Sequence, residues 1–519
     1  MYIEKIKIKN YKQFKNLEVK FNPLINILIG ENGAGKTSIL EAISYVLGAN
    51  DRGVESEGIQ SLFNVEVIKE YLDGEKNYEN LPVLEVELFI AENEHQFKLV
   101  GKHNSEKDEL SGLKMRISPN DDYASEIAET LSHSEVFPFD YYKVEFKTFD
   151  GGSYTSYNRY LRYATIDSAK VNSKHATQKF IEDYYKRVKK SEERAKLQHQ
   201  FRERSHQFSK ELLRSEENSE YQLKLNAHKG KALEESLTIQ KKDIDIANLG
   251  RGDSMFFNID FALSRTKQDT NIILIEEPEN HLSYLNMHRL IKKVDETEEK
   301  QIFIATHSNM IATRLDLQNA IFLGDGKSTK LNDLDEETSH FFQKSPDNNV
   351  LNFILSNKVI LVEGNTEYIL LDSFYKKYIG KEMYEDGIAM ISVGGLSFKR
   401  YLKIAQKINK KVAVITDNDR DYRKNIEESY REYVSDNIKV FANKESQEYT
   451  LEVSIYKHNE AFLDKHLKND QMRNGVLSYM LSNKAEAAFR ILRLLEKCEL
   501  DKEFEIPSHI KEAYKWIRL

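Results

Sequence analysis

The sequence GENGAGKT, at residues 30–37, decides the fold of the first part of the chain. The apolar residues 25–29 run directly into it, and residues 38–47 follow with apolar side chains at helical spacing up to Gly48. A glycine-rich turn between a strand and a helix lets backbone N–H groups come close to phosphate oxygens. The pattern therefore predicts a P-loop that binds a nucleoside triphosphate, with ATP as the expected ligand.

Each polar residue of this turn has an expected role. Lys36 is expected to reach the β and γ phosphates, and the Thr37 hydroxyl is expected to coordinate Mg²⁺. The expected nucleotide contacts are Asn32, Gly33, Gly35, Lys36, Thr37 and Ser38.

Two further apolar stretches, residues 271–275 and 301–305, end in polar residues and predict neighbouring parallel strands. We expect Glu276 to join the ATP-binding site through the metal–water shell, and Glu277 to orient or deprotonate the attacking water. His307 follows the second strand and is expected to hydrogen-bond the γ phosphate as a catalytic residue. Taken alone, the glutamates are typical of a solvated turn and the histidine of a structural residue; the P-loop upstream favours the catalytic interpretation.

The remaining segments of the first half supply scaffold. Residues 2–8 and 17–21 predict short strands, and residues 82–90 predict a half-exposed strand of an antiparallel sheet. From about residue 166 to 240, long charged stretches predict an inserted helical arm. The arm is either a solvated helical hairpin or a surface for dimerisation or nucleic acid.

A second domain is predicted from about residue 350 to 519. Residues 358–362 form an apolar strand that ends at Glu363, and residues 412–416 form another that ends at Asp417 and Asp419. Both sets of carboxylates are therefore expected at the carboxyl edge of one parallel sheet. Clustered carboxylates repel one another unless cations neutralise them, and oxygen ligands suit Mg²⁺ or Mn²⁺. Metal-assisted phosphodiester cleavage is the natural use of such a cluster.

The composition limits the class of protein. The chain has 519 residues, enough for two to four domains, and its net charge of -8 argues against a generally nucleic-acid-binding surface without excluding a basic cleft. No apolar run approaches the length of a membrane span, so a membrane protein is not expected. With no visible secretory signal and Cys498 as the single cysteine, we expect a cytoplasmic protein.

The motifs of the first half resemble an ABC-type ATPase of the SMC, RecF and OLD group over roughly residues 1–345. The resemblance depends on residues 6–14, the P-loop, residues 275–282 and residues 305–308. In that group two heads sandwich ATP, and a signature loop from one completes the site of the other. The best match here is residues 249–254, where Leu249 replaces the expected serine. Gln60 is a candidate for the loop glutamine that senses Mg²⁺.

The second domain resembles a Toprim domain over about residues 355–485, including the sequence SVGG at residues 392–395. The resemblance implies Glu363 as general acid or base and metal ligand, and Lys484 as the transition-state lysine. The other metal ligands that it implies are Glu367, Asp417, Asp419 and, for a second metal, Glu452. Without this context, Glu452 is typical of a strand-end charge and Lys484 of a solvated helix start.

Basic residues lie close in sequence to this predicted centre. Residues 399–403 and 407–411 carry lysines and Arg400, which are expected to track a phosphate backbone or to form a solvated helix face. Neither interpretation identifies a base sequence.

The fold class expected is α/β, an ABC-type P-loop ATPase head with an inserted helical arm, followed by a Toprim α/β domain. This is the OLD-family layout, and it implies an ATP-gated, divalent-metal-dependent endonuclease acting as a homodimer or higher oligomer, with DNA favoured as substrate. By the same resemblance we expect a role in anti-phage defence, beside a helicase or a retron reverse transcriptase with its nucleic acid. Two alternatives stay open: a non-cleaving ATPase clamp or sensor of the RecF and SMC kind, and an RNA (tRNA) nuclease. A topoisomerase is disfavoured because no tyrosine nucleophile can be singled out.

Overall fold

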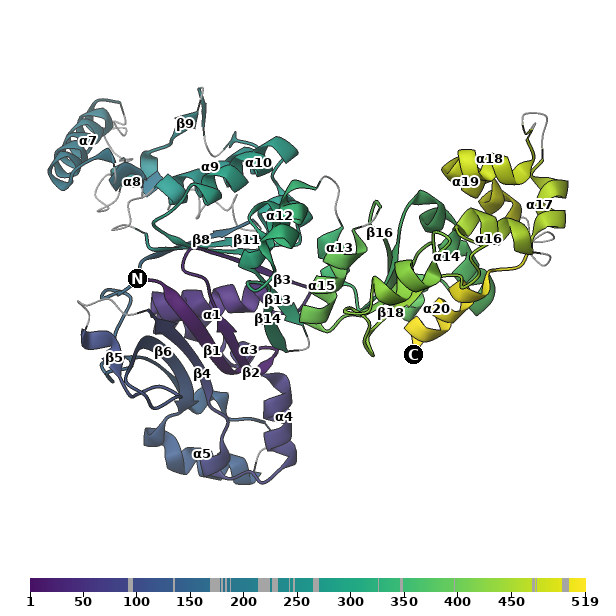
Figure 1. The fold of residues 1–519 in the computed structure, drawn as a ribbon. Helices are drawn as coiled ribbons and strands as arrows, with labels where there is room; N and C mark the ends of the chain where they lie inside the picture. Colours follow the sequence, from purple (N-terminus) through teal and green to yellow (C-terminus); the bar gives the residue numbers. More distant parts are fainter. Residues whose placement is uncertain are drawn as a thin grey trace. The chain divides into compact units, whose positions relative to one another are not determined.

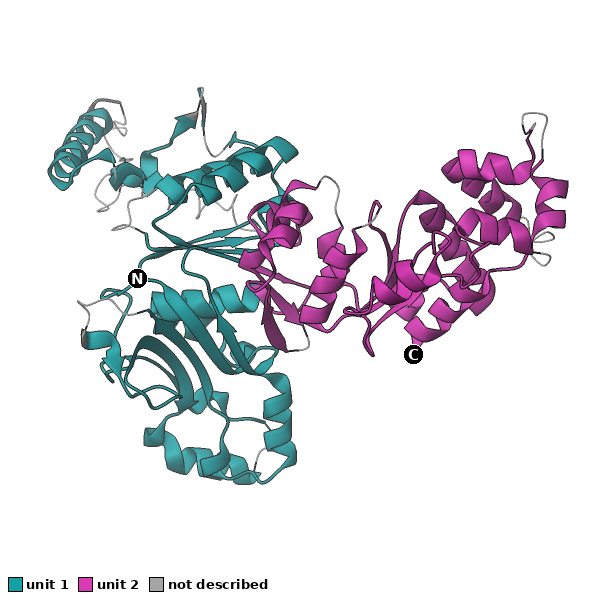
Figure 2. Cartoon of the chain, viewed as in Figure 1, with its two compact units in different colours: residues 1–26, 37–306 teal, residues 27–36, 307–519 magenta. Residues whose placement is uncertain are grey.

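The computed structural model of the chain forms two compact units (Figures 1 and 2). Unit 1 contains Met1–Asn26 and Thr37–Thr306, and unit 2 contains Ile27–Lys36 and His307–Leu519. The predicted domain bounds, 1–345 and 350–519, fall elsewhere and stay a prediction. The structure describes residues 1–91, 97–133, 136–168, 178, 181–182, 184–186, 188–212, 225, 232–241, 243–245, 248–264, 270–324, 326–345, 349–395, 397–468, 472, 474–496 and 504–519.

An antiparallel sheet forms one layer of unit 1, in the order β2-β1-β4-β6-β5, with β7 also paired to β6. Apolar side chains alternate along β1, where Ile6 and Ile8 are buried beside exposed or half-buried lysines. The strands are β1 (Ile3–Tyr11), β2 (Phe14–Lys20), β4 (Leu84–Ile90), β5 (Val100–Gly101), β6 (Leu110–Pro119) and β7 (Tyr142–Thr148).

The strand predicted at residues 82–90 is present, but the prediction that it is half exposed was wrong. β4 lies between β1 and β6, and Glu87 is only 2% exposed. The Glu87 carboxylate lies 3.2 Å from the Lys114 ammonium and accepts a hydrogen bond from the backbone N–H of Ser105. This pairing across the sheet allows a charged residue to be buried in a central strand.

A second layer of unit 1 is the parallel set β12-β11-β8, which confirms the predicted pair of parallel strands. β11 (Ile272–Glu276) is flanked by β12 (Gln301–Ala305) and β8 (Tyr163–Asp167), and all of its residues before Glu276 are fully buried. The helices of this unit are α1 (Lys36–Gly48), α2 (Asp51–Ser56), α3 (Ile59–Leu62), α4 (Val65–Asp73), α5 (Ala124–His133), α7 (Ser191–Leu212), α8 (Ala232–Ser236), α9 (Arg251–Ser264) and α10 (Tyr284–Asp295).

The predicted helical arm at residues 166–240 lies partly outside the described residues. Its first residues belong to β8 and are therefore strand, whereas α7 and α8 are helical as expected. A short hairpin follows, formed by β9 (Gln240–Lys241) and β10 (Ile244–Asp245). The dimerisation role of the arm stays a prediction.

Unit 2 begins at Ile27, within the strand that leads into the P-loop. β3 (Ile25–Gly30) pairs in parallel with β13 (Ala320–Gly324), which pairs antiparallel with β14 (Lys327–Lys330). The helix α11 (Asn309–Arg314) precedes β13 in the chain. The helices α12 (Glu336–Lys344) and α13 (Val350–Leu355) follow β14.

The rest of unit 2 is built on a four-stranded parallel sheet, in the order β16-β15-β17-β18. The strands are β15 (Lys358–Val362), β16 (Ile388–Ser392), β17 (Lys411–Ile415) and β18 (Ile438–Phe441). The helices are α14 (Asn365–Ile379), α15 (Phe398–Ile408), α16 (Leu451–His458), α17 (Glu460–His466), α18 (Val476–Ser482), α19 (Lys484–Leu495) and α20 (Ser508–Arg518). This is the parallel Toprim-like sheet expected from the sequence.

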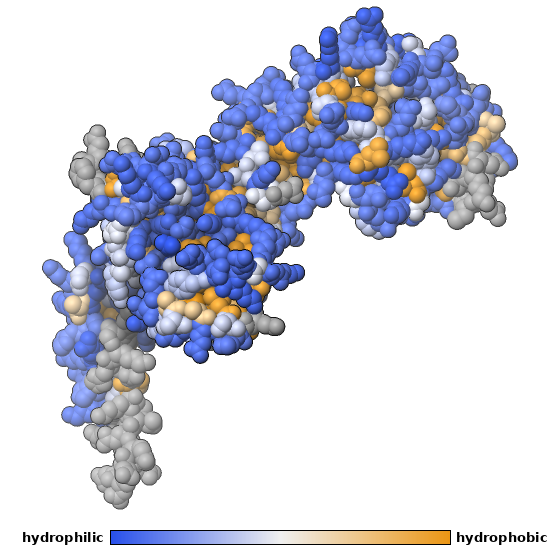
Figure 3. Space-filling view, turned by 90° about the horizontal axis from the view of Figure 1, so that it is seen from below, coloured by the Kyte–Doolittle hydropathy of each residue, from blue (hydrophilic) through white to orange (hydrophobic). Residues whose placement is uncertain are grey.

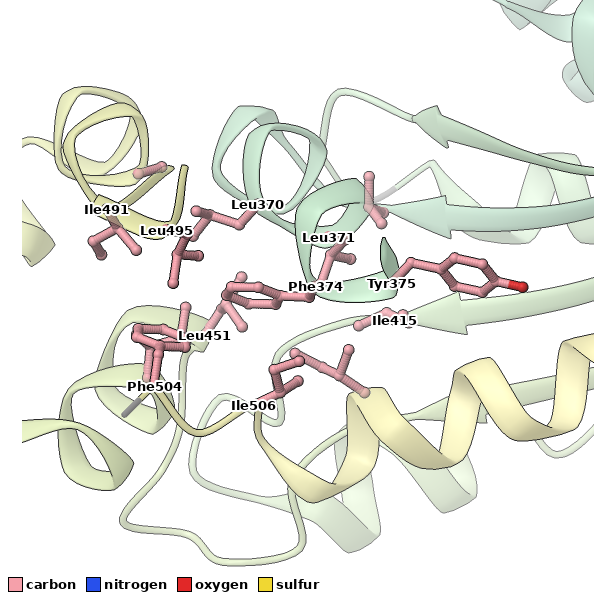
Figure 4. Close-up of a cluster of buried hydrophobic side chains, with 14 of the residues drawn as sticks. Leu370, Leu371, Phe374, Tyr375, Ile415, Leu451, Ile491, Leu495, Phe504 and Ile506 are labelled. Carbon is pink, nitrogen blue, oxygen red and sulfur yellow. The ribbon is translucent and has the colours of Figure 1, made fainter. Parts of the chain in front are cut away.

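A buried apolar cluster fixes the helices that carry the polar residues of this sheet edge (Figure 4). Phe374 of α14, Leu451 of α16 and Ile491 of α19 belong to this cluster, and each is no more than 4% exposed. Leu451 directly precedes Glu452, and α19 begins at Lys484. Packing of the core therefore positions both residues.

The face shown in Figure 3 is mostly hydrophilic, with hydrophobic residues in several small groups among hydrophilic ones. Among the residues that the structure describes, none of the helices combines the length and apolar character that crossing a bilayer requires.

Candidate functional site

Two glycines of the predicted P-loop have a positive φ. Gly33 and Gly35 have φ values of 78° and 96°, which side chains other than glycine rarely adopt. The Lys36 ammonium donates hydrogen bonds to the carbonyls of Gly30 (2.8 Å) and Glu31 (3.0 Å). The Lys36 ammonium thus bonds to the backbone of its own loop. To contact a phosphate, it would have to give up these carbonyl partners.

Thr37 and Glu276, which are both predicted to serve the metal ion of the nucleotide, are in contact. The Thr37 hydroxyl donates a hydrogen bond to the Glu276 carboxylate, which lies at the end of β11. Burial raises the pKa of Glu276, the hydrogen bond from Thr37 lowers it, and the charge of Asp167 raises it again, with a net rise. A divalent cation would relieve this burial of negative charge, so the pair fits a Mg²⁺ ion.

Glu277 is held in a strained backbone conformation. Its φ of 43° and ψ of 54° lie in the left-handed region, which a residue with a side chain seldom occupies. The Glu277 N–H donates to the Ala305 carbonyl (2.9 Å), and the Asn280 amide donates to the Glu277 carboxylate (2.7 Å). These bonds fix the direction of the carboxylate, and Asn280 is a positioning residue to which the sequence assigned no role.

Ser38 and Gln60 are predicted to serve the nucleotide site, and in this structure both contact other parts of unit 1. Ser38 is 8% exposed, and its hydroxyl donates to the Gln13 side chain at 3.1 Å. Gln60 lies on α3 and lines a pocket of about 670 Å³ together with Phe137 and Tyr142. Asn32 is exposed in the turn, and His307 directly follows Thr306 after β12. The proposed roles of these residues stay predictions.

The suggested signature residues begin a helix. α9 starts at Arg251, and a Cβ added to Gly252 would lie 2.4 Å from the backbone carbonyl oxygen of His281. Gly252 therefore has a packing role within its own unit. At Gly250, by contrast, an added Cβ meets nothing within 4 Å.

The second site lies at the carboxyl edge of the sheet in unit 2. Glu363 follows β15, Asp417 follows β17, and Glu367 lies in the first turn of α14, where its carboxylate accepts from the Gly364 N–H at 3.0 Å. Asp417 accepts from the N–H of Leu451 at 2.9 Å, which draws the start of α16 to the same edge.

The carboxylates of this edge act electrostatically on one another. Burial raises the pKa of Asp417 to about 8, and the charges of Glu367, Glu452 and Glu363 add to the rise. Burial also raises the pKa of Glu363, with Asp419 as the next cause. Glu367 is 8% exposed, and burial and the charge of Glu452 raise its pKa. Burial and mutual repulsion thus favour the protonated forms of these carboxyls, and a bound cation would favour their ionised forms.

Lys484 supplies positive charge to this cluster. Its ammonium lies 3.2 Å from the Glu452 carboxylate, which is itself buried. Burial lowers the pKa of Lys484, but the charges of Glu452, Asp417 and Glu367 outweigh it, so the net pKa is raised and the side chain stays an ammonium. The structure thus brings both late-sequence candidates to the edge that carries Glu363.

Carboxylate oxygens of this kind are the ligands that Mg²⁺ or Mn²⁺ prefers. In this structure they do not point at one common position. In the part of the chain that the structure describes, no three carboxylate or imidazole groups are close enough together to hold a metal ion as they stand. Mutual repulsion keeps carboxylates apart, and a divalent cation would draw them together.

Asn418 is a residue of this site that sequence reasoning passed over. It is 1% exposed, and its amide nitrogen lies 2.7, 3.1 and 3.3 Å from the carbonyl oxygens of Asn443, Glu445 and Glu448. Its side-chain oxygen accepts from the N–H of Arg420 at 2.7 Å. Asp419 and Arg420 both have positive φ, 48° and 70°, so Asn418 holds a strained turn beside the carboxylates. Only long-range contacts reveal this role.

For the basic stretches at residues 399–403 and 407–411, the sequence leaves both a phosphate track and a solvated helix face open, and neither fits Lys410. Lys410 is 8% exposed, and its ammonium donates to the backbone carbonyls of Ile354 and Ser356. Lys411 lies 5.2 Å from the centre of the Trp516 ring. Lys410 is therefore part of the core packing and does not face a nucleic acid.

Comparison with known proteins identifies two domains along the chain. Residues 1–312 match the family model described as an AAA ATPase domain. The chain belongs to this family. Residues 354–419 match the model described as the Toprim domain of overcoming lysogenization defect (OLD) protein-like proteins. The chain is thus an OLD-type ATPase–Toprim protein, which confirms the resemblance and the fold class predicted from the sequence. The two domains support a nuclease-type ATPase that uses a nucleotide and a divalent metal ion.

Curated relatives match the ATPase–Toprim chain over short stretches. The RecF DNA replication and repair protein of Oceanobacillus iheyensis is 51% identical over 47 residues, which are 9% of this chain and 12% of that protein. RecF of Rickettsia canadensis is 37% identical over 99 residues, 19% of this chain and 25% of that protein. The matched stretch covers no more than a quarter of either relative.

Solved structures are similar at low identity. An SMC head bound to the C-terminal winged-helix domain of ScpA is 17% identical, covering 64% of this chain and 99% of that one with a TM-score of 0.36. The C-terminal region of the Burkholderia pseudomallei OLD protein is 21% identical, covering 31% of this chain and 97% of that one with a TM-score of 0.22. Both TM-scores lie below 0.5, so the assignment rests on the family models.

Proposed function

We propose that the protein is an ATP-gated, divalent-metal-dependent endonuclease that cleaves nucleic acid, with DNA as the favoured substrate. The observation that carries the proposal is the edge of the parallel sheet in unit 2, where Glu363, Asp417 and Glu452 share one electrostatic environment with Lys484. Divalent ions bound there would activate water and stabilise the leaving oxygen of a phosphodiester.

The residues of the chain would divide the work as follows. Glu363 exchanges a proton with water or with the leaving oxygen, which its raised pKa favours. Glu367, Asp417, Asp419 and Glu452 supply oxygen ligands. The Lys484 ammonium, which stays charged at neutral pH, stabilises negative charge that develops on the phosphate.

ATP provides the control input in this proposal. Lys36 and Thr37 bind the triphosphate and its Mg²⁺ ion, Glu276 completes the metal–water shell, and the Glu277 carboxylate directs water at the γ phosphate. The fixed orientation of Glu277 by Asn280 supports this role. His307, two residues beyond the end of β12, would respond to the γ phosphate.

The test compares nicking of supercoiled DNA by wild type and Glu363→Ala, each with Mg²⁺ or Mn²⁺. Glu512→Ala is the matched control, because Glu512 is exposed on α20 and lies outside the carboxylate cluster. We expect the control to cleave like wild type and Glu363→Ala to lose cleavage. Equal nicking by all three proteins would refute the catalytic assignment.

Parallel reactions with labelled DNA and RNA decide the substrate class. If Lys36→Ala abolished biological activity while Glu363→Ala and Asp417→Ala kept it, the protein would instead be a non-cleaving clamp or sensor.

We further propose a homodimer that acts in defence against phage, beside a helicase or a retron reverse transcriptase. Protection in a plaque assay should then be lost in Glu363→Ala.

A further inference from the structure

A row of cations on α15 is covered by a row of acids from the segment just before and at the start of α12. Arg400 lies 2.8 Å from Glu337, Lys403 lies 3.0 Å from Asp335, and Lys407 lies 3.3 Å from Asp333. We call residues 333, 335 and 337 the acidic row and residues 400, 403 and 407 the cationic row. The two rows run antiparallel in sequence, and each acid has its own cation.

The cationic row has the spacing of a phosphate-binding surface. Residues 400, 403 and 407 recur at helical spacing, so they share one face of α15. A rise of 1.5 Å per residue puts Arg400 and Lys407 about 10 Å apart along the helix. This distance is close to three axial steps of one strand, about 3.4 Å each, which is the span of four successive phosphates.

The row starts beside the proposed cleavage centre. α15 follows the turn at Gly394 and Gly395, and the Gly395 N–H donates to the backbone carbonyl of Glu363 at 3.1 Å. In the first turn of α15, the Lys399 ammonium lies 5.7 Å from the centre of the Tyr430 ring. The charges of Glu363 and Asp419 reach this tyrosine. A strand that leaves the centre along α15 would therefore meet the cationic row.

The acids cover these cations without being built into the core. The side chains of Asp333 and Glu337 are 73% and 81% exposed, whereas those of Arg400 and Lys407 are 26% and 31% exposed. Apolar contacts hold α15 independently, because Tyr401 packs against Phe342 and Phe353 at ring distances of 5.0 and 5.2 Å. Asp333 and Glu337 can thus leave by side-chain rotation alone, whereas Asp335 also accepts a hydrogen bond from the Thr338 N–H as the N-cap of α12.

We propose that the acidic row is an internal competitor for nucleic acid: its carboxylates occupy the phosphate-binding face of α15 until a polyanionic strand displaces them. Exposed ion pairs of this kind are individually weak, so a strand with many phosphates can replace all three. The surface then sets a threshold, since short or weakly bound strands do not displace the acids. The proposal rests on the nuclease function above and names a binding surface that regulates it.

The test measures binding of fluorescently labelled duplex and single-stranded oligonucleotides by anisotropy, with EDTA present so that nothing is cleaved. The release variant is Asp333→Asn, Asp335→Asn and Glu337→Gln. Asp335 also accepts from the Thr338 N–H at 3.0 Å as the N-cap of α12, and asparagine keeps this cap. The matched control changes the charge equally at three exposed acids elsewhere in unit 2, Glu432→Gln, Glu496→Gln and Glu512→Gln.

We expect the release variant to bind about tenfold more tightly than wild type at low salt, and its plot of log affinity against log salt to steepen by about 2 to 3 units for duplex. The control triple should gain far less. Adding Arg400→Gln, Lys403→Gln and Lys407→Gln to the release variant should remove the gain. The proposal is overturned if the release variant binds like the control triple, or if its gain survives loss of the cationic row.

These outcomes are independent of the nuclease test. Tighter binding by the release variant together with unchanged nicking by Glu363→Ala would keep the binding surface and reject the cleavage centre. Loss of cleavage in Glu363→Ala with no gain in the release variant would do the reverse. Melting temperatures within a few degrees of wild type show that the variants are folded.

Discussion

Replacing Asn418 with alanine should weaken metal binding at the carboxylate edge without touching a ligand. The Asn418 amide contacts three backbone carbonyls of the loop at residues 443–448, at 2.7 to 3.3 Å, from a position that is 1% exposed. The loop leads into Glu452, and Asn418 itself joins Asp417 to Asp419. The side chain is thus a clamp between two sets of proposed ligands.

The magnitude follows from the bonds lost. An amide nitrogen has two hydrogens to share among these carbonyls, and each lost bond with a buried partner left unsatisfied costs about 1–2 kcal/mol, which gives roughly 2–4 kcal/mol in all. Residues that orient metal ligands typically change metal affinity about 10–100-fold when removed. We therefore expect Mn²⁺ to bind Asn418→Ala at least tenfold more weakly.

Mn²⁺ binding is measured by isothermal titration calorimetry, and the stability of the metal-free protein is measured by thermal unfolding. Asn418→Asp should be at least as damaging as alanine, because a carboxylate cannot donate to the three carbonyls. Asn437→Ala is the matched control, since the Asn437 amide makes a single exposed bond to the Asn409 side chain. Wild-type Mn²⁺ affinity and melting temperature in Asn418→Ala would refute the clamp.

Three further outcomes are expected. Glu277→Gln should retain ATP binding while ATP hydrolysis falls about 10²- to 10⁴-fold, and retained turnover in a phosphate-release assay would exclude the water-directing role. Gly252→Ala should lower stability by about 1–3 kcal/mol because its Cβ would meet the His281 carbonyl oxygen at 2.4 Å, whereas Gly250→Ala should not, as unfolding curves of both can show. Burial lowers the pKa of His509 to about 4 from 6.5, so the unfolded chain binds the proton first and stability falls as the pH drops from 6.5 towards 4, by about 3 kcal/mol. His509→Gln should flatten this part of the pH dependence of the melting temperature, and an unchanged pH profile would contradict the buried neutral imidazole.

Sequence patterns predicted the parts of the fold that depend on local order. Buried apolar runs such as residues 358–362 and 412–416 specify strands, and strands in one parallel sheet bring their carboxyl ends to one edge. Glu363 and Asp417 could therefore be placed together from the order of strands and acids along the chain. The P-loop could be predicted equally well from the sequence, because its backbone geometry requires glycines.

The contacts that orient these residues could not be predicted in the same way. The bond from Asn418 to the loop at residues 443–448 joins residues 25 to 30 positions apart, and the burial of Glu87 depends on Lys114 in a neighbouring strand. The lysines at residues 403 and 410 are the same residue type in one basic stretch, yet Lys403 pairs with an acid while Lys410 is buried against carbonyls. Tertiary packing decides such differences.

We propose that a nucleotide bound at the P-loop controls cleavage at the Toprim edge. The most direct measurement is nuclease activity on defined DNA and RNA with no nucleotide, ATP, ADP or a non-hydrolysable ATP analogue, for wild type and Lys36→Ala. Cleavage by wild type should change with the nucleotide supplied, and cleavage by Lys36→Ala should not. Equal cleavage by wild type under all four conditions, or no metal-dependent cleavage of either nucleic acid, would contradict it.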